Sequence, residues 1–416
     1  MELRIKNRIK YLLLHIIHFL VRFVPRNQKI WIFGSGNNRF AGNSKWLFLY
    51  LHNSNKMNIR KIWLSRNQGI VEMLKTKGFE AYYLNSLRGL YYAARGGIYL
   101  FNVNTNYDIS YFFSAGARKI NLCHGITMIK KSHLASDLKN NYSYKLFHGN
   151  LKQKIHYHFF CPYEYEKYDI MISTSEKIKK HLKNAIGKRA KNISITGYPR
   201  NDVLLKKIDS PFEEDEKLIE YFNVIKSNQK KIILYMPSYR DAKIYKSEPI
   251  NIPINWKKLN SFLEKNNSIF ILKLHPVERA PIQISPIYKN IRVLNKAADI
   301  YPILKYVDIL ITDYSSICYD FLLYSKPTVF YLYDLEEYKT EHQSLRDNFE
   351  TILPGPIVKT FDVLLDTLNN TLNNESNFIK KYAGKIDYCL HLAHKYIDSN
   401  SSERVYEEII NKFIKK

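Results

Sequence analysis

Cysteine, long apolar runs and acidic residues are all scarce in this sequence of 416 residues. Its four cysteines lie far apart, without the close pairs that a zinc site or a small disulfide framework needs. No other cluster of metal-ligating residues stands out, so we expect no metal ion and no cofactor. Scattered thiols of this kind are typical of a reducing, cytosolic compartment.

The apolar stretch from Tyr11 to Val24 is too short for a membrane-spanning helix, which needs about 20 apolar residues. No small-residue cleavage site follows it, which argues against a signal peptide. Lysines and arginines surround the stretch, so we predict that residues 1–29 form a basic amphipathic helix on an anionic membrane surface. A helix packed on the following domain is the alternative.

The shortage of acidic residues leaves a net charge of +26, from 64 Lys and Arg against 38 Asp and Glu. Such a field attracts polyanions, among them nucleic acids, anionic lipids and phosphate polymers. No recognised nucleic-acid-binding motif is present, so we expect no nucleic-acid partner. The sequence is also rich in Asn, Ile and Tyr, as an AT-rich coding sequence would make it, and this is a second explanation for the excess of lysine.

A chain of this length exceeds what one hydrophobic core usually organises, so we expect two domains. Short apolar strands alternate with helical patterns in both halves, which predicts an α/β fold with two Rossmann-like domains and parallel sheets. A charged segment with Ser210 and Pro211 marks the boundary between them. The predicted segments after the first helix are an N-terminal domain over 30–205, a C-terminal domain over 206–384, and helices over 385–416 that brace the two domains.

Polar residues follow the strand-like segments of the second half. The strand Ile309 to Thr312 ends at Asp313, and Ser315 and Ser316 lie where a helix is expected to begin. Backbone N–H groups and two hydroxyls at a helix start suit a phosphate, although ordinary N-capping by serine is the alternative. Asp320 lies four residues after Ser316 and therefore on the same helical face.

Two histidines also end strand-like segments. His275 precedes Pro276, and His124 precedes Gly125. Ligands of open parallel sheets bind at the carboxyl ends of the strands, where a neutral imidazole can act as a general base. For a single histidine in such a position, a structural role is the more frequent alternative. Two turn clusters, GYPRND over 197–202 and PSYRD over 237–241, each carry an arginine that suits phosphate oxygens, although each alone is more typical of a structured turn.

Taken together and in this order, HG at 124, GYPRND, PSYRD, HP at 275 and TDYSS at 312 resemble the CDP-glycerol glycerophosphotransferase family of teichoic acid and capsule synthesis. The resemblance implies a GT-B fold whose two sheets face a central cleft. It also implies transfer of glycerol phosphate, or a related alditol phosphate, from CDP-glycerol or CDP-ribitol to a lipid-linked or oligomeric polymer acceptor, with release of CMP. Such an enzyme would act peripherally at the cytoplasmic face of the cell membrane.

The resemblance also assigns roles to residues. Catalysis is assigned to His124, His275 and Asp320. The donor is assigned to Arg240, His275, Pro276, Asp313, Ser315, Ser316 and Asp320. Gly125, Lys130 and Lys131 are predicted to bind the acceptor because they follow His124, although the residues after HG depart from the family's usual Thr-Pro-Leu-Lys continuation.

The mechanistic hypothesis is that His124 takes a proton from an acceptor hydroxyl, which attacks the β-phosphorus of the donor. His275 and the helix start at Ser315 would stabilise the charge on the phosphates. Two rival functions remain: a GT-B glycosyltransferase that uses a nucleotide sugar, and a protein that binds nucleic acid or another polyanion.

Overall fold

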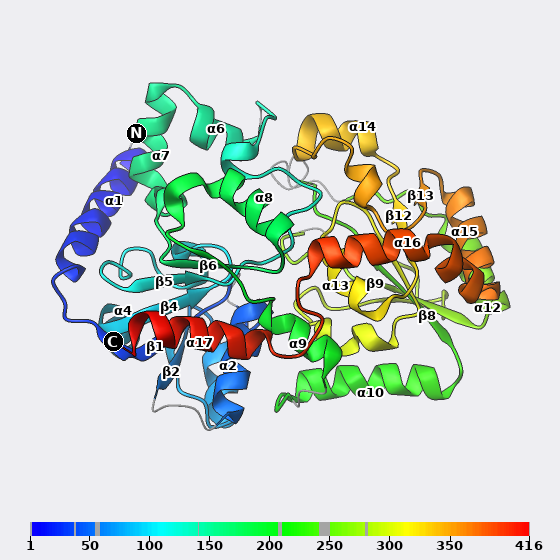
Figure 1. The fold of residues 1–416 in the computed structure, drawn as a ribbon, viewed down its shortest axis with the longest axis horizontal. Coiled ribbons are helices and arrows are strands. Elements are labelled where there is room, and N and C mark those ends of the chain that lie inside the picture. Colours follow the sequence, from blue (N-terminus) through cyan, green and yellow to red (C-terminus); the bar gives the residue numbers. More distant parts are fainter. Residues whose placement is uncertain are drawn as a thin grey trace. The chain divides into compact units, whose positions relative to one another are not determined.

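The computed structural model describes residues 2–36, 39–54, 59–139, 141–206, 210–240, 250–278 and 282–415. Contacts divide the chain into two compact units. The first unit comprises Met1–His124, Lys145–Ile208 and Asp398–Lys416, and the second comprises Gly125–Tyr144 and Asp209–Ile397. Each unit is built on a parallel sheet covered by helices, which confirms the predicted α/β class (Figure 1).

The first unit contains a seven-stranded sheet in the order β3-β2-β1-β4-β5-β6-β7. Neighbouring strands are parallel throughout. The strand order reverses between β1 and β4, which makes the crevice beyond their carboxyl ends a topological switch point. The strands are β1 (Asn27–Phe33), β2 (Arg60–Ser65), β3 (Ala81–Tyr83), β4 (Gly96–Phe101), β5 (Arg118–Asn121), β6 (Ile170–Ser173) and β7 (Ile193–Ile195).

Several helices of the first unit begin where a polar side chain caps the backbone. Ser175, for example, accepts from the N–H of Ile178, and Asn67 accepts from the N–H of Gly69. These helices are α1 (Glu2–Val21), α2 (Gly42–Asn53), α3 (Gln68–Thr76), α4 (Leu87–Arg95), α5 (Thr105–Asp108), α7 (Leu151–Phe160), α8 (Glu176–Ile186), α9 (Pro199–Leu205) and α17 (Ser401–Phe413), and α6 (Tyr142–His148) spans a boundary between the units.

Helix α1 is shorter than predicted, because it ends at Val21 and strand β1 begins at Asn27. Pro25, which cannot donate a backbone hydrogen bond, lies between them. One face of α1 packs on the first unit, as the alternative interpretation expected: His15 Nε2 lies 2.9 Å from the carbonyl oxygen of Phe159, and the ring of His18 stacks on Tyr111.

The opposite face of α1 leaves large apolar side chains exposed. They recur at the three- and four-residue spacing of one helical face. They are Ile9, Leu12, Leu13, Ile16, Phe19 and Leu20, with Phe23 just after the helix, and each is at least 47% exposed. No helix in the described part of the chain is long and apolar enough to cross a membrane.

The second unit contains a six-stranded parallel sheet in the order β10-β9-β8-β11-β12-β13. Here the order reverses between β8 and β11. The strands are β8 (Lys231–Met236), β9 (Ser268–Leu272), β10 (Ile291–Val293), β11 (Ile309–Thr312), β12 (Thr328–Tyr331) and β13 (Ile357–Val358). The helices are α10 (Glu213–Ser227), α12 (Trp256–Lys265), α13 (Ile317–Phe321), α14 (Leu335–Glu337), α15 (Phe361–Asn373) and α16 (Glu375–Ala393).

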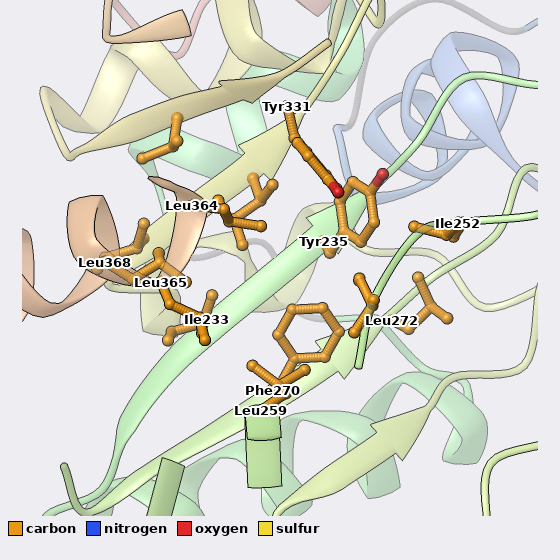
Figure 2. Packing of buried hydrophobic residues seen from close by; sticks show 14 of the residues in the cluster. Ile233, Tyr235, Ile252, Leu259, Phe270, Leu272, Tyr331, Leu364, Leu365 and Leu368 are labelled. Carbon is orange, nitrogen blue, oxygen red and sulfur yellow. The ribbon is translucent and has the colours of Figure 1, made fainter. Parts of the chain in front are cut away.

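A core on one face of this sheet joins the central strands to two helices. Ile233 on β8 and Phe270 on β9 are buried in the same cluster as Leu259 of α12 and Leu368 of α15 (Figure 2). Because β8 and β11 are buried and rich in Ile and Leu, they occupy the sheet centre, where both faces are covered by other elements.

The structure groups two segments differently from the predicted domains. Residues 125–144, predicted in the N-terminal domain, belong to the second unit, because their backbone bonds there: Lys131 N–H donates to the carbonyl oxygen of Ser344 at 2.8 Å, and Lys130 forms a bridge with Leu345. The C-terminal helices divide between the units, with α16 in the second and α17 in the first.

We predict that Leu368→Ala lowers the free energy of unfolding by about 2–5 kcal/mol, because it opens a cavity in the core of the second unit. Val363→Ala is the matched control on the same helix, since Val363 is 49% exposed and surface changes of this kind cost about 0.5 kcal/mol or less. Urea unfolding followed by circular dichroism measures both. Equal effects of the two changes would contradict the assigned packing of α15.

Candidate functional site

The candidate site lies beyond the carboxyl ends of β8 and β11, where the strand order of the second sheet reverses. Hydrogen bonds join the end of β8 and its following loop to the end of β11 and its following loop. The N–H of Ser238 donates to Asp313 Oδ1 at 2.8 Å, and the hydroxyl of Thr312 donates to the carbonyl oxygen of Met236 at 2.7 Å. Polar side chains from both loops therefore keep fixed relative positions.

Arg240 is buried between two carboxylates in this region. Its Nε and Nη2 donate to Asp334 at 2.6 and 3.1 Å, and its Nη1 lies 3.0 Å from Asp313 Oδ2. Nη1 also donates to the carbonyl oxygen of Ser238 at 2.7 Å. Burial alone would lower the pKa of Arg240, but the two carboxylates outweigh it and hold that pKa well above its ordinary value.

The structure thus places Arg240 against two carboxylates, and a direct contact between Arg240 and phosphate oxygens stays a prediction. The side chains of Arg240 and Asp313 are both fully buried, and their contacts hold the two loops together. Asp334, three residues after β12 and just before α14, was missed by the sequence analysis, although a carboxylate soon after a strand was a signal available there. Asp334 also lines a hollow of about 480 Å³.

His275 follows β9 on the same edge of the sheet. Its Nδ1 lies 3.3 Å from the N–H of Val277 and accepts from it, so the ring proton resides on Nε2, which makes Nε2 a hydrogen-bond donor. The ring lies 4.7 Å from that of Tyr239. Pro276 begins a turn in which the N–H of Glu278 donates to the carbonyl oxygen of His275 at 2.9 Å. The orientation of the imidazole is thus set by the hydrogen bond at Nδ1 and by the contact with the Tyr239 ring.

Ser315 and Ser316 lie between β11 and α13, and both are half-buried. Ser316 occupies the N-cap position, but its side chain makes no capping hydrogen bond, so the ordinary capping interpretation does not apply to it. Ser315 Oγ lies 3.5 Å from the N–H of Ile317. Because α13 contains only five residues, the hydroxyls contribute more to this site than a helix dipole does.

Asp320 lies on α13 but is completely buried, and the hydroxyl of Tyr301 donates to its Oδ2 at 2.8 Å. Its position anchors α13 to the segment before β11. A direct contact between Asp320 and a ligand stays a prediction.

The segment after His124 brings further predicted residues to the second unit. Lys130 Nζ lies 3.3 Å from Ser238 Oγ and 5.5 Å from the centre of the Tyr239 ring. Gly125 packs so closely that a Cβ atom there would lie 2.7 Å from Ser316 Oγ. The side chain of Lys131 is directed toward Asp137, whose carboxylate its Nζ binds at 2.6 Å. Sequence reasoning assigned these residues to the acceptor and missed the contacts of Lys130 with Ser238 and Tyr239.

His124 is in the first unit, at the carboxyl edge of that unit's sheet. It follows β5 after two buried residues, Leu122 and Cys123, and its own side chain is exposed. Burial raises the pKa of the Cys123 thiol to about 12, so this neighbour remains a neutral thiol near pH 7. Within the described residues, no group of three His, Cys, Asp or Glu side chains could hold a metal ion.

Comparison with known proteins supports one family. The sequence model described as CDP-Glycerol:Poly(glycerophosphate) glycerophosphotransferase matches residues 16–411. The chain is 32% identical to the teichoic acid ribitol-phosphate polymerase TarL of Staphylococcus aureus over 54% of this chain and 38% of that protein. It is 28% identical to a teichoic acid poly(glycerol phosphate) polymerase of Bacillus spizizenii over 99% of this chain and 100% of that protein.

A structural likeness accompanies the sequence match. The solved structure of the wall teichoic acid polymerase TagF aligns with a TM-score of 0.72 and 20% identity, over 98% of this chain and 99% of that chain. This likeness confirms the predicted GT-B type of fold. The matches to three ribitol-phosphate polymerases span only 38%, 42% and 38% of their lengths.

We predict that Arg240→Gln destabilises the second unit by about 3–5 kcal/mol, because it leaves two buried carboxylates without their cation. Arg60→Gln is the control: Arg60 makes a similar paired contact with Glu80, but at the surface, where such pairs contribute about 0–1 kcal/mol. Urea midpoints of the two variants test this difference, and an Arg240 effect no larger than that of Arg60 would refute the buried network.

Proposed function

This chain belongs to the CDP-glycerol:poly(glycerophosphate) glycerophosphotransferase family, and we propose that it transfers an alditol phosphate from a CDP-alditol to a polymer hydroxyl. The donor is CDP-glycerol or CDP-ribitol, the acceptor is a lipid-linked or oligomeric surface polymer, and CMP is released. The observation that carries the proposal is the gathering of His275, Ser315, Ser316 and Lys130 around the switch point of the second sheet.

The donor diphosphate fits the hydrogen-bond donors at this edge. His275 presents Nε2–H after β9, and the hydroxyls of Ser315 and Ser316 follow β11, two strands away in the sheet. The carboxylates of Asp313 and Asp334 would repel a diphosphate, but Arg240 pairs with both of them. Lys130 adds a cation beside Ser238, so the edge favours an anionic ligand.

The transfer step forms one bond to phosphorus and breaks another. His124 accepts the proton of the acceptor hydroxyl, and the oxygen attacks the β-phosphorus of the donor in line. The bond between that phosphorus and the bridging oxygen breaks, and CMP leaves with the electron pair. His275 and Lys130 stabilise the charge that develops on the phosphate oxygens.

We predict that purified protein releases CMP from CDP-glycerol or CDP-ribitol when acceptor is present, and that His124→Ala lowers this rate about 100-fold or more, because the general base is lost. Donor binding, measured by calorimetry, should survive in His124→Ala and weaken in His275→Ala. His391→Ala is the matched control, since His391 is an exposed histidine on α16.

Each outcome decides between functions. CMP release that persists in His124→Ala would remove this histidine as the base. Turnover of a nucleotide sugar with release of a nucleoside diphosphate, and none of either CDP-alditol, would replace the proposal with the glycosyltransferase alternative.

Peripheral attachment to the cytoplasmic face of the membrane is the second part of the proposal, and α1 and α7 support it. The exposed apolar face of α1 is accompanied by Arg8 and Lys10. Helix α7 packs beside it, since the rings of Phe160 and Tyr11 lie 5.1 Å apart, and α7 exposes Leu151 and Ile155. Apolar side chains flanked by cations are typical of helices that lie in an anionic lipid surface.

We predict that the double change Leu13→Asp and Phe19→Asp abolishes sedimentation of the protein with phosphatidylglycerol vesicles, because charged side chains cannot enter the acyl region. The control is Val363→Asp with Tyr388→Asp, which alters two exposed apolar residues of the second unit. Undiminished sedimentation of the α1 variant, or equal loss in the control, would count against the assigned surface.

A further inference from the structure

The turn that carries His124 has an uncommon backbone. Cys123, just before it, adopts φ of 56°, in the left-handed region that side chains with a Cβ rarely occupy. Such a conformation is strained and persists only where the surroundings hold it. It reverses the chain so that Leu122 and Cys123 are buried while the next residue, His124, is exposed.

Asn43, on the first turn of α2, holds the turn from one side. Its side chain is fully buried, and its Nδ2 donates to the carbonyl oxygens of Leu122 at 2.7 Å and Cys123 at 2.8 Å. Its Oδ1 accepts from the backbone N–H of Arg200 at 3.1 Å. Both amide hydrogens and the amide oxygen are therefore used, and they connect three segments that are distant in the sequence.

Arg200 binds the carbonyl group of the next residue along the chain, His124. It lies on the first turn of α9, its side chain is buried, and its Nη1 donates to the carbonyl oxygen of His124 at 2.6 Å. The carbonyls of residues 122, 123 and 124 are thus bound by two buried side chains.

Helix α9, which carries Arg200, is itself held in place by hydrogen bonds to the start of α17. The carboxylate of Asp202 accepts from the N–H groups of Ser401 and Ser402 at 2.9 and 2.8 Å, at the start of α17. Gly197, with φ of 81°, permits the close approach, because an added Cβ would collide with Ser401 Oγ. The GYPRND cluster therefore links the C-terminal helix to the turn at His124.

We propose that Asn43 and Arg200 are positioning residues that set the direction of the His124 side chain for proton transfer. The inference rests on the proposed function, in which His124 is the base. Without the donors from Asn43 and Arg200, the turn would relax toward negative φ and redirect the imidazole. A displacement of about 1 Å in a reacting group can lower a rate about 100-fold.

Asn43→Asp is the sharpest test, since it keeps the size of the side chain and replaces the two N–H donors by oxygen. Arg200→Gln removes the guanidinium, and Arg200→Lys restores one cationic donor. We expect kcat for CMP release to fall about 10–100-fold in Asn43→Asp and Arg200→Gln, with partial recovery in Arg200→Lys. The KM for the CDP-alditol should change less than about twofold.

Arg26→Gln is the matched control for a purely structural effect. Arg26 donates to the carbonyl oxygens of Ala93, Gly96, Phe113 and Ala115 in the same unit. We expect this variant to lower the melting temperature while kcat of the folded protein is kept. A kcat loss in Arg26→Gln that matches that of Asn43→Asp at equal melting temperature would overturn the proposal.

A second readout needs no substrate and so separates this proposal from the proposed function. In protein labelled at histidine, the ring signal of His124 is assigned by its disappearance in His124→Ala. Asn43→Asp and Arg200→Gln should shift this signal and Arg26→Gln should not. If the wild type uses neither CDP-alditol, the proposed function fails, and the positioning role is still decided by this signal: an unchanged His124 signal in Asn43→Asp overturns it.

Discussion

The guanidinium of Arg240, enclosed by Asp313 and Asp334, is the interaction on which the carboxyl edge of the second sheet depends. A buried ion is stable only when nearby charges and hydrogen bonds replace its hydration. Here Arg240, from the loop after β8, contacts Asp313 after β11 and Asp334 before α14. Backbone N–H groups of Ser238 and Tyr314 donate to the other carboxylate oxygen of Asp313. These contacts join the loops at the edge that His275 and Ser316 also occupy.

The same interaction determines what kind of ligand the edge can attract. Two carboxylates beside a phosphate site would repel it, but their charges are largely compensated by Arg240, out of contact with solvent. Lys130 then supplies a cation from a segment that lies between β5 and β6 of the first sheet in sequence yet belongs to the second unit. The charges that the proposed diphosphate would meet thus come from parts of the chain more than a hundred residues apart.

In the first unit, the loop after β5 is held by side-chain donors that bind its carbonyl groups. Carbonyl groups beyond the end of β5 have no strand partner, and buried carbonyls without donors are costly. Asn43 and Arg200 satisfy them and, in doing so, hold a backbone conformation that a residue with a side chain rarely adopts. In both units a buried arginine binds the backbone or carboxylates of a loop, next to a histidine or serine to which we assign a proposed role.

The sequence by itself determined the α/β class, the two sheets and the family, because strand alternation and ordered short motifs are local features of the chain. It also placed His124, His275, Ser315 and Ser316 after strands, since a parallel strand dictates which end its polar neighbours occupy. Only the tertiary structure decided that Arg240 pairs with Asp313 and Asp334, that residues 125–144 join the second unit, and that one face of α1 packs while the other stays exposed. Burial and charge pairing arise from contacts between distant segments, and no local pattern of residues specifies them.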